Sequence, residues 1–206
     1  QQPTPSKASV ATIPRTQAFP EIDGGGYSIM PLRELAAIGT GSMNTNEAIV
    51  DGKYPFFVRS QKPLATNTAL FDETAIITAG DGVGVGKVFH FVEGKYGLHQ
   101  RAYRIVPSSN VVIPKYMFHY IRYAFRKYIE NTAVHASVTS LRKPMFEKFP
   151  VPVPPLEEQE RIVNILDKFE ALVNDLTSGL PAEIEARRQQ YEYYRDQLLD
   201  FPELKA

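Results

Sequence analysis

The clearest hydrophobic pattern in the chain follows a proline-rich strip at residues 150–155. Proline fixes its own φ and keeps the preceding residue out of the α region, so this strip is expected to be extended. Glutamates at 157, 158 and 160 suit the positive end of a helix dipole. Beyond them, apolar residues recur three and four positions apart, as one buried helical stripe requires. The residues of this stripe are Ile162, Ile165, Leu166, Phe169, Leu172, Val173 and Leu176.

The same spacing continues toward the end of the chain through Leu180, Ile184, Tyr191, Tyr194 and Leu198. Because Gly179 and Pro181 interrupt it, both a kinked helix and two joined helices fit the pattern. We favour the kinked helix, which over 156–200 would extend roughly 65 Å. A body of this size would not bury such a stripe alone, so we expect another helix to cover it.

Upstream, the pattern changes to short β-like segments. Residues 1–26 are rich in Pro, Ser, Thr and Gly and predict a flexible arm or linker. Apolar residues on one face predict a helix over 114–130. Strands are expected at 54–59, 75–79, 87–92 and 102–106, with a turn at 93–95. The pattern therefore indicates an α+β fold with a compact β-rich domain at 27–155 and a long helical region at 156–206.

Charge is divided unevenly along this 206-residue chain, although its formal net charge is zero. Residues 27–155 carry 15 Lys and Arg against 9 Asp and Glu, whereas residues 156–206 carry 6 against 12. A basic body joined to an acidic helical region suggests that only the body faces a polyanion. The chain has no cysteine, which excludes disulfides and thiolate metal sites and suits a reducing cytoplasm. No apolar run is long enough for a membrane span. Because the sequence begins with Gln1, we expect a processed form or a fragment.

The run of alternating glycines at 80–86 is the main suggestion of an enzyme. It lacks the Gly-Lys-Ser/Thr ending of a phosphate-binding loop, since Val88 follows Lys87, and it lacks the third glycine of a dinucleotide fingerprint. Such glycines more often allow a turn with positive φ. The four histidines lack metal-ligand spacing, and no nucleophile–base grouping is evident. We therefore expect no catalysis, metal or cofactor on this chain.

One family pattern is specific. Residues 152–167, Pro-Val-Pro-Pro-Leu-Glu-Glu-Gln-Glu-Arg-Ile-Val-Asn-Ile-Leu-Asp, resemble the conserved junction of the specificity subunits of type I restriction–modification systems. The four-residue repeats and residues 187–199 resemble the rest of that region, and residues 32–41, 52–57 and 76–86 resemble parts of the recognition domain. This resemblance implies a target recognition domain joined to a conserved helix. A complete subunit has two of each, so this chain resembles a half subunit.

The resemblance directs attention to polar loop residues that could contact DNA. Asn and Gln pair with adenine in the major groove, Arg and Lys pair with guanine, and phosphate contacts should outnumber base contacts. The candidates are Ser42, Asn44, Thr45, Asn46, Arg59, Ser60, Lys62, Lys87, His99, Gln100, Arg101, Ser137, Thr139, Ser140, Arg142 and Lys143.

We therefore expect a non-catalytic subunit that reads one half of a bipartite double-stranded DNA target in the cytoplasm. The apolar stripe would form an antiparallel coiled coil with a second copy or a second half subunit, giving a twofold dimer. The resemblance implies that methyltransferase and restriction subunits supply the chemistry and bind S-adenosylmethionine, ATP and Mg²⁺. Two alternatives stay open: a coiled-coil adaptor without DNA specificity, and a nucleotide-binding enzyme that uses the 80–86 loop.

Overall fold

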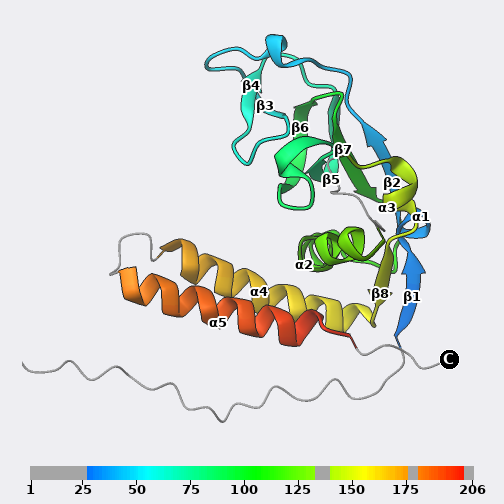
Figure 1. Cartoon of the computed structure of the whole chain (residues 1–206), viewed down its shortest axis with the longest axis vertical. Coiled ribbons are helices and arrows are strands. Elements are labelled where there is room, and N and C mark those ends of the chain that lie inside the picture. Colours follow the sequence, from blue (N-terminus) through cyan, green and yellow to red (C-terminus); the bar gives the residue numbers. More distant parts are fainter. Residues whose placement is uncertain (1–26, 133–139, 176–180, 202–206) are drawn as a thin grey trace, which may run out of the picture.

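The computed structural model describes residues 27–132, 140–175 and 181–201, with only the backbone for 172–175 and 181–184 (Figure 1). Several predicted features therefore lie outside the described residues. These are the arm at 1–26, the candidates Ser137 and Thr139, the stripe residues Leu176 and Leu180, and the side chains of Leu172, Val173 and Ile184.

A six-stranded mixed sheet forms the upper layer of the molecule in Figure 1, in the order β2-β7-β5-β6-β3-β4. Among the strand pairs of this sheet in the described residues, β3 and β6 are parallel and the others are antiparallel. The strands are β2 (Ala36–Thr40), β3 (Tyr54–Phe57), β4 (Leu64–Thr66), β5 (Phe71–Ala79), β6 (Phe89–Leu98) and β7 (Ala102–Pro107). Their alternating side chains line both faces of the sheet. On β5, Ile76 belongs to the main core and Ile77 to a smaller core, and both are fully buried.

One strand differs from its prediction. The expected turn at 93–95 is wrong, because β6 continues through it and Glu93 and Gly94 stay paired with Thr74 and Glu73 of β5. Gly94 has a φ of 96°, which a glycine adopts without leaving the ladder. Tyr96 and Leu98, both buried, extend the apolar alternation beyond the glycine.

A second, two-stranded sheet joins the first and last strands of the body. β1 (Ser28–Pro31) pairs antiparallel with β8 (Pro150–Val153), in a register that joins Ser28 to Val153 and Pro31 to Pro150. The prediction that the proline strip is extended is therefore confirmed over 150–153. The strip leads directly into the first helix of the C-terminal region.

The long helix α2 (Pro114–Thr132) lies between the six-stranded sheet and the C-terminal helices, and it confirms the helix expected at 114–130 (Figure 1). Of the residues predicted to line one face, Met117, Ile121 and Phe125 are buried and Ala124 and Tyr128 are partly buried. The shorter elements are α1 (Leu32–Leu35), α3 (Lys143–Glu147) and the 3₁₀ turns η1 (Thr45–Glu47) and η2 (Gly82–Gly84). None of the helices in the described part of the chain is both long and apolar enough to cross a membrane.

The C-terminal region is helical, as expected, but it consists of two helices. α4 (Leu156–Asp175) and α5 (Pro181–Leu199) run side by side in opposite directions as a hairpin, so the favoured single kinked helix is corrected (Figure 1). Phe169 stacks on Tyr194, with 4.9 Å between ring centroids. The physical reason is burial: folding back lets α5 and α2 cover the α4 stripe.

Three predicted stripe residues are buried within the chain: Ile162 and Leu166 are 0% exposed and Leu198 is 3% exposed. Ile165 and Tyr191 pack against the same core, and Phe169 and Tyr194 are half-buried. The argument that the stripe has no cover inside the chain is therefore wrong for these residues. Dimerisation itself stays a prediction.

Candidate nucleic-acid interface

Two arginines share one aspartate at an end of the six-stranded sheet. Arg59 donates from Nη1 to Asp81 Oδ1 at 2.8 Å, and Arg101 donates from Nη1 to Asp81 Oδ2 at 3.2 Å. The side chains of Arg59 and Arg101 are 44% and 60% exposed, and that of Asp81 is 24% exposed. Burial opposes the ionisation of Asp81, but the hydrogen bonds and charges of both arginines outweigh it and lower its pKa. The site therefore presents two held cations to solvent.

Strand pairing explains why these residues meet. β5 ends at Ala79, opposite Ala102 at the start of β7, so Asp81 follows one strand where Arg101 precedes its neighbour. The Gly80 amide donates to the Arg101 carbonyl at 2.8 Å, and a Cβ on Gly80 would lie 2.6 Å from that oxygen. Glycine is therefore required at 80 for this close approach.

Arg59 reaches the same end through the parallel pair. Phe57 of β3 lies opposite Leu98 of β6, and the His99 amide donates to the Phe57 carbonyl at 3.0 Å. Gly84 packs on the Arg59 backbone, where a Cβ would lie 2.5 Å from the Arg59 carbonyl oxygen. The glycines at 82 and 86 have φ of 75° and 66°. The prediction that this glycine run serves a turn is confirmed.

A pair of amides adjoins the arginines. Gln100 Nε2 donates to Asn44 Oδ1 at 2.5 Å, and the Gln100 backbone amide donates to the Met43 carbonyl at 2.9 Å. Both side chains are exposed. We call Asn44, Arg59, Asp81, Gln100 and Arg101 the Asp81 cluster.

His99 lies beneath this cluster and supports it. It is 5% exposed, and its Nδ1 accepts a hydrogen bond from the Arg101 backbone amide at 3.0 Å. Burial, together with the charges of Arg59 and Arg101, lowers the pKa of His99. A neutral, largely covered ring shapes the 99–101 loop and offers little surface to a ligand.

The segment that begins at Ser140 contacts the backbone of Gly80 and Asp81. Ser140 forms an antiparallel bridge with Asp81, and the Leu141 amide donates to the Gly80 carbonyl at 2.7 Å. Arg142 and Lys143 follow and are exposed, with Lys143 Nζ lying 3.7 Å from Glu147 Oε1. The structure thus brings Ser140 next to residues far away in sequence.

Other candidates are exposed but less closely tied to the cluster. Ser60 adjoins Arg59, and its Oγ donates to the Lys62 carbonyl at 2.7 Å. Among the hydrogen bonds and ion pairs of the described residues, none joins the side chains of Ser42, Thr45, Asn46, Lys62 or Lys87 to the Asp81 cluster. Whether any candidate contacts DNA stays a prediction.

Sequence reasoning missed Asp81 because it searched for hydrogen-bond donors to bases and phosphates. A usable signal was present, since Asp81 is an acid two positions after a predicted strand, within a glycine run. It also missed Val83 and Val50, whose exposed fractions of 95% and 91% are unusual for apolar residues.

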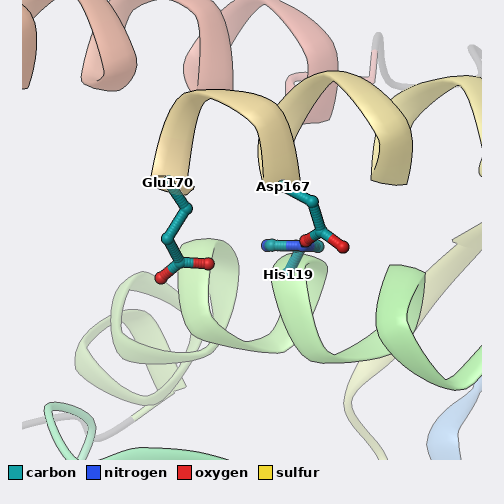
Figure 2. A group of neighbouring side chains, drawn as sticks. All are labelled: His119, Asp167 and Glu170. Atoms are coloured by element: carbon teal, nitrogen blue, oxygen red, sulfur yellow. The ribbon is translucent and has the colours of Figure 1, made fainter. Parts of the chain in front are cut away.

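One group outside the Asp81 cluster has ligand types that metals use. His119 on α2 and Asp167 and Glu170 on α4 converge between the two helices (Figure 2), with their ligand atoms within 4.8 Å of one another. Lys115 Nζ lies 3.8 Å from Asp167 Oδ1, however, and Arg122 Nη1 lies 2.8 Å from Glu170 Oε1. Because these cations already neutralise both carboxylates, the group fits an ion network between helices better than a metal site.

His119 takes part in this network as a buried group. His119 Nε2 lies 2.8 Å from Asp167 Oδ1, and the His119 side chain is 1% exposed. Burial lowers the pKa of His119, while the hydrogen bond to Asp167 opposes that shift. His119 therefore connects α2 to α4.

The sequence is similar to a known protein family and to several of its members. Residues 25–186 match the family model described as the type I restriction modification DNA specificity domain. The chain is 42% identical over 106 residues to the EcoR124I/EcoR124II specificity subunit of Escherichia coli, covering 51% of this chain and 26% of that protein. It is 36% identical over 126 residues to a putative type I restriction enzyme specificity subunit of Haemophilus influenzae, covering 61% and 31%.

Solved structures agree at the level of the fold. The S subunit of a type I restriction–modification system from M. genitalium aligns with a TM-score of 0.63 at 17% identity, over 76% of this chain and 42% of that one. The HsdS subunit from Thermoanaerobacter tengcongensis aligns with a TM-score of 0.56 at 16% identity, over 88% and 47%. The chain spans less than half the length of these proteins. By its family match, it belongs to the specificity subunits of type I restriction–modification systems, which are non-catalytic components of those systems.

Proposed function

We propose that this chain reads one half of a bipartite DNA target through the end of the six-stranded sheet that carries the Asp81 cluster. The observation that carries the proposal is the convergence, on one exposed surface, of Asn44, Arg59, Gln100 and Arg101 from three separate loops. Arginine and amide side chains are those that read base edges in the major groove. The excess of basic residues in 27–155 favours a polyanionic ligand.

Selection from a pool of random duplexes tests this proposal directly. The full chain should enrich one short motif, and its affinity for that duplex should exceed its affinity for a scrambled one at physiological salt. For each phosphate contact, log affinity should fall against log salt with a slope of about −0.9. A flat salt dependence, or equal binding to all duplexes, would contradict DNA reading and favour the adaptor alternative.

The second half of the target calls for a second reader, and we propose a twofold dimer. An isologous contact between two copies is an economical way to supply two readers. Since Ile162, Leu166 and Leu198 are already buried, a second copy would dock on the outer surface of the hairpin or exchange helices with it. Tyr193, which is 61% exposed on α5, is a residue that such docking could cover.

Sedimentation equilibrium at micromolar concentration tests the dimer. Wild-type chain should sediment as twice its 23.2 kDa mass, and Tyr193→Glu should shift it toward the monomer without changing its helical circular dichroism. A wild-type chain that stays monomeric throughout would exclude the homodimer and leave pairing with a different half subunit.

In the proposed role, partner subunits carry out the chemistry of restriction and modification. A methyltransferase subunit would bind S-adenosylmethionine, and a restriction subunit would use ATP and Mg²⁺, in the cytoplasm where chromosomal DNA is accessible. Methylation mapping of the host genome with and without this gene tests that role. Loss of methylation at a single bipartite motif is the expected outcome.

A further inference from the structure

The Asp81 carboxylate is out of place on a surface that approaches phosphates. A lone anion there would repel DNA. Asp81 is instead bonded through Oδ1 to one arginine and through Oδ2 to the other. The three side chains together carry a net positive charge, so Asp81 lowers the attraction to phosphate while it fixes the directions of two guanidinium groups.

The backbone holds Asp81 rigidly in this role. Gly80 donates its amide to the Arg101 carbonyl and accepts the Leu141 amide on its own carbonyl, and Ser140 bridges Asp81 on the same side. The carboxylate is thus fixed between the 99–101 loop and the 140–143 segment. Two long side chains that would otherwise sample many rotamers are held by a fixed acceptor.

The part of each arginine that remains available is the part that recognises guanine. Each arginine gives one N–H of Nη1 to Asp81, which leaves the parallel Nε–H and Nη2–H pair free of hydrogen bonds among the described residues. A parallel pair of donors matches the N7 and O6 acceptors of guanine. Nonspecific phosphate binding would not require such fixed orientation.

We infer that Asp81 is a positioning residue that orients Arg59 and Arg101 to read guanine, so that the half-site contains a G·C pair contacted in the major groove. This inference rests on the proposed function. It goes further by naming a base and a residue that does not itself touch the DNA.

The test compares variants of the full chain on the motif that wild-type chain selects. Asp81→Asn should reduce the preference for guanine over the other bases at the contacted position by about tenfold or more. Affinity for random duplex should stay level or rise, because the variant gains one positive charge. Asp81→Glu keeps the carboxylate and should restore part of the preference. Asp72→Asn is the matched control, since Asp72 is an exposed strand residue 4.0 Å from Lys95 and belongs to a different surface.

A chemical probe keeps the test independent of folding. Replacing the selected guanine by 7-deazaguanine removes the N7 acceptor, and wild-type binding should fall while Asp81→Asn is insensitive. Equal loss of affinity for every duplex in Asp81→Asn would indicate a phosphate clamp and overturn the inference. An unchanged guanine preference in that variant, or no effect of 7-deazaguanine on wild-type chain, would also overturn it. If wild-type chain selects no motif at all, the proposed function itself fails.

Discussion

Two charged networks in this protein differ in the group at their centre: one has a partly exposed aspartate, and the other has a buried histidine. In the Asp81 cluster, a carboxylate holds two arginines that are 44% and 60% exposed. Between α2 and α4, the His119 side chain is 1% exposed and bonds to Asp167, whose side chain is 41% exposed. Surface ion pairs contribute only about 0–1 kcal/mol to stability, whereas breaking a buried polar contact costs considerably more. The Asp81 cluster is therefore suited to orient groups for a ligand, and the buried His119 contact is suited to join the helical hairpin to the body.

The largest loss of stability is expected on substitution of Gln159, a fully buried polar residue near the start of α4. Gln159 is 0% exposed, its Nε2 donates to the carbonyls of Val111 and Pro154, and its Oε1 accepts the Ile113 amide. Gln159→Ala leaves these backbone groups without partners and should lower the free energy of unfolding by about 3 kcal/mol or more.

Urea denaturation followed by circular dichroism measures this loss. Gln189→Ala is the control, because Gln189 is exposed on α5 and bonds only to Glu185 at 3.3 Å among the described contacts. A Gln159 variant as stable as the Gln189 variant would show that these three hydrogen bonds contribute little to the stability of the fold.

Leu198 tests the helical hairpin itself. Leu198 is 3% exposed only because α5 folds back onto the body, so Leu198→Ala should destabilise the chain by about 2–4 kcal/mol. A continuous helix would carry Leu198 far from the body and make the change nearly neutral for the monomer. Denaturation at a concentration where the chain is monomeric separates the two arrangements. Glu192→Ala, at an exposed position of the same helix, is the control.

Lower pH should destabilise the folded chain through the buried His119. The pKa of His119 is lowered in the folded chain, mainly by burial, so the unfolded chain takes up a proton first as the pH falls. The stability that His119 contributes is complete above its ordinary pKa of about 6.5 and is lost as the pH falls below that value. The charges of Asp167 and Glu170 oppose this lowering of the His119 pKa, and the charge of Lys115 adds to it.

Thermal melting between pH 7.5 and 5.5 should therefore show a falling melting temperature in the wild-type chain. His119→Gln, which cannot take up a proton, should show a smaller fall. The histidines at 90 and 99 also have lowered pKa values and remain in the variant, so part of the dependence should persist. If the melting temperature falls equally with pH in both proteins, His119 does not contribute to the pH dependence of stability.

The smallest effect on stability is expected in the exposed network. Arg59→Ala should change the free energy of unfolding by less than about 1 kcal/mol, because its ion pair with Asp81 is partly solvated. Its effect on DNA should be much larger, with loss of sequence preference in the selection assay. A variant that unfolds readily would place Arg59 with the structural residues.

Several elements could be predicted because their signals are local. The four-residue spacing in α2 and the prolines of β8 each restrict the backbone without help from distant residues. The hairpin could not be chosen from the sequence, because Gly179 and Pro181 permit a kink as readily as a reversal. An apolar stripe also looks the same whether its cover comes from the same chain or from another.

In the candidate site, too, single residues could be predicted from the sequence but their arrangement could not. Arg59, Gln100 and Arg101 were identified as polar loop residues, but their convergence depends on the parallel pairing of β3 with β6, which the sequence pattern does not specify. Asp81 was missed because its role depends on two arginines more than 19 positions away in the chain. Gly94 misled the interpretation, since a glycine within a strand resembles a turn signal.

The pairing of β1 with β8 has a consequence for how such proteins diverge. Ser28 and Val153 are paired across the two strands, so the chain enters and leaves the body at adjacent points (Figure 1). The body is attached to the helical hairpin through this two-stranded sheet and through the packing of α2 on α4 and α5. Residues within the body can change in number and identity while the two attachment points stay where they are. Under the proposed function, changes confined to the loops of the six-stranded sheet would alter the target while α2, α4 and α5 keep their contacts.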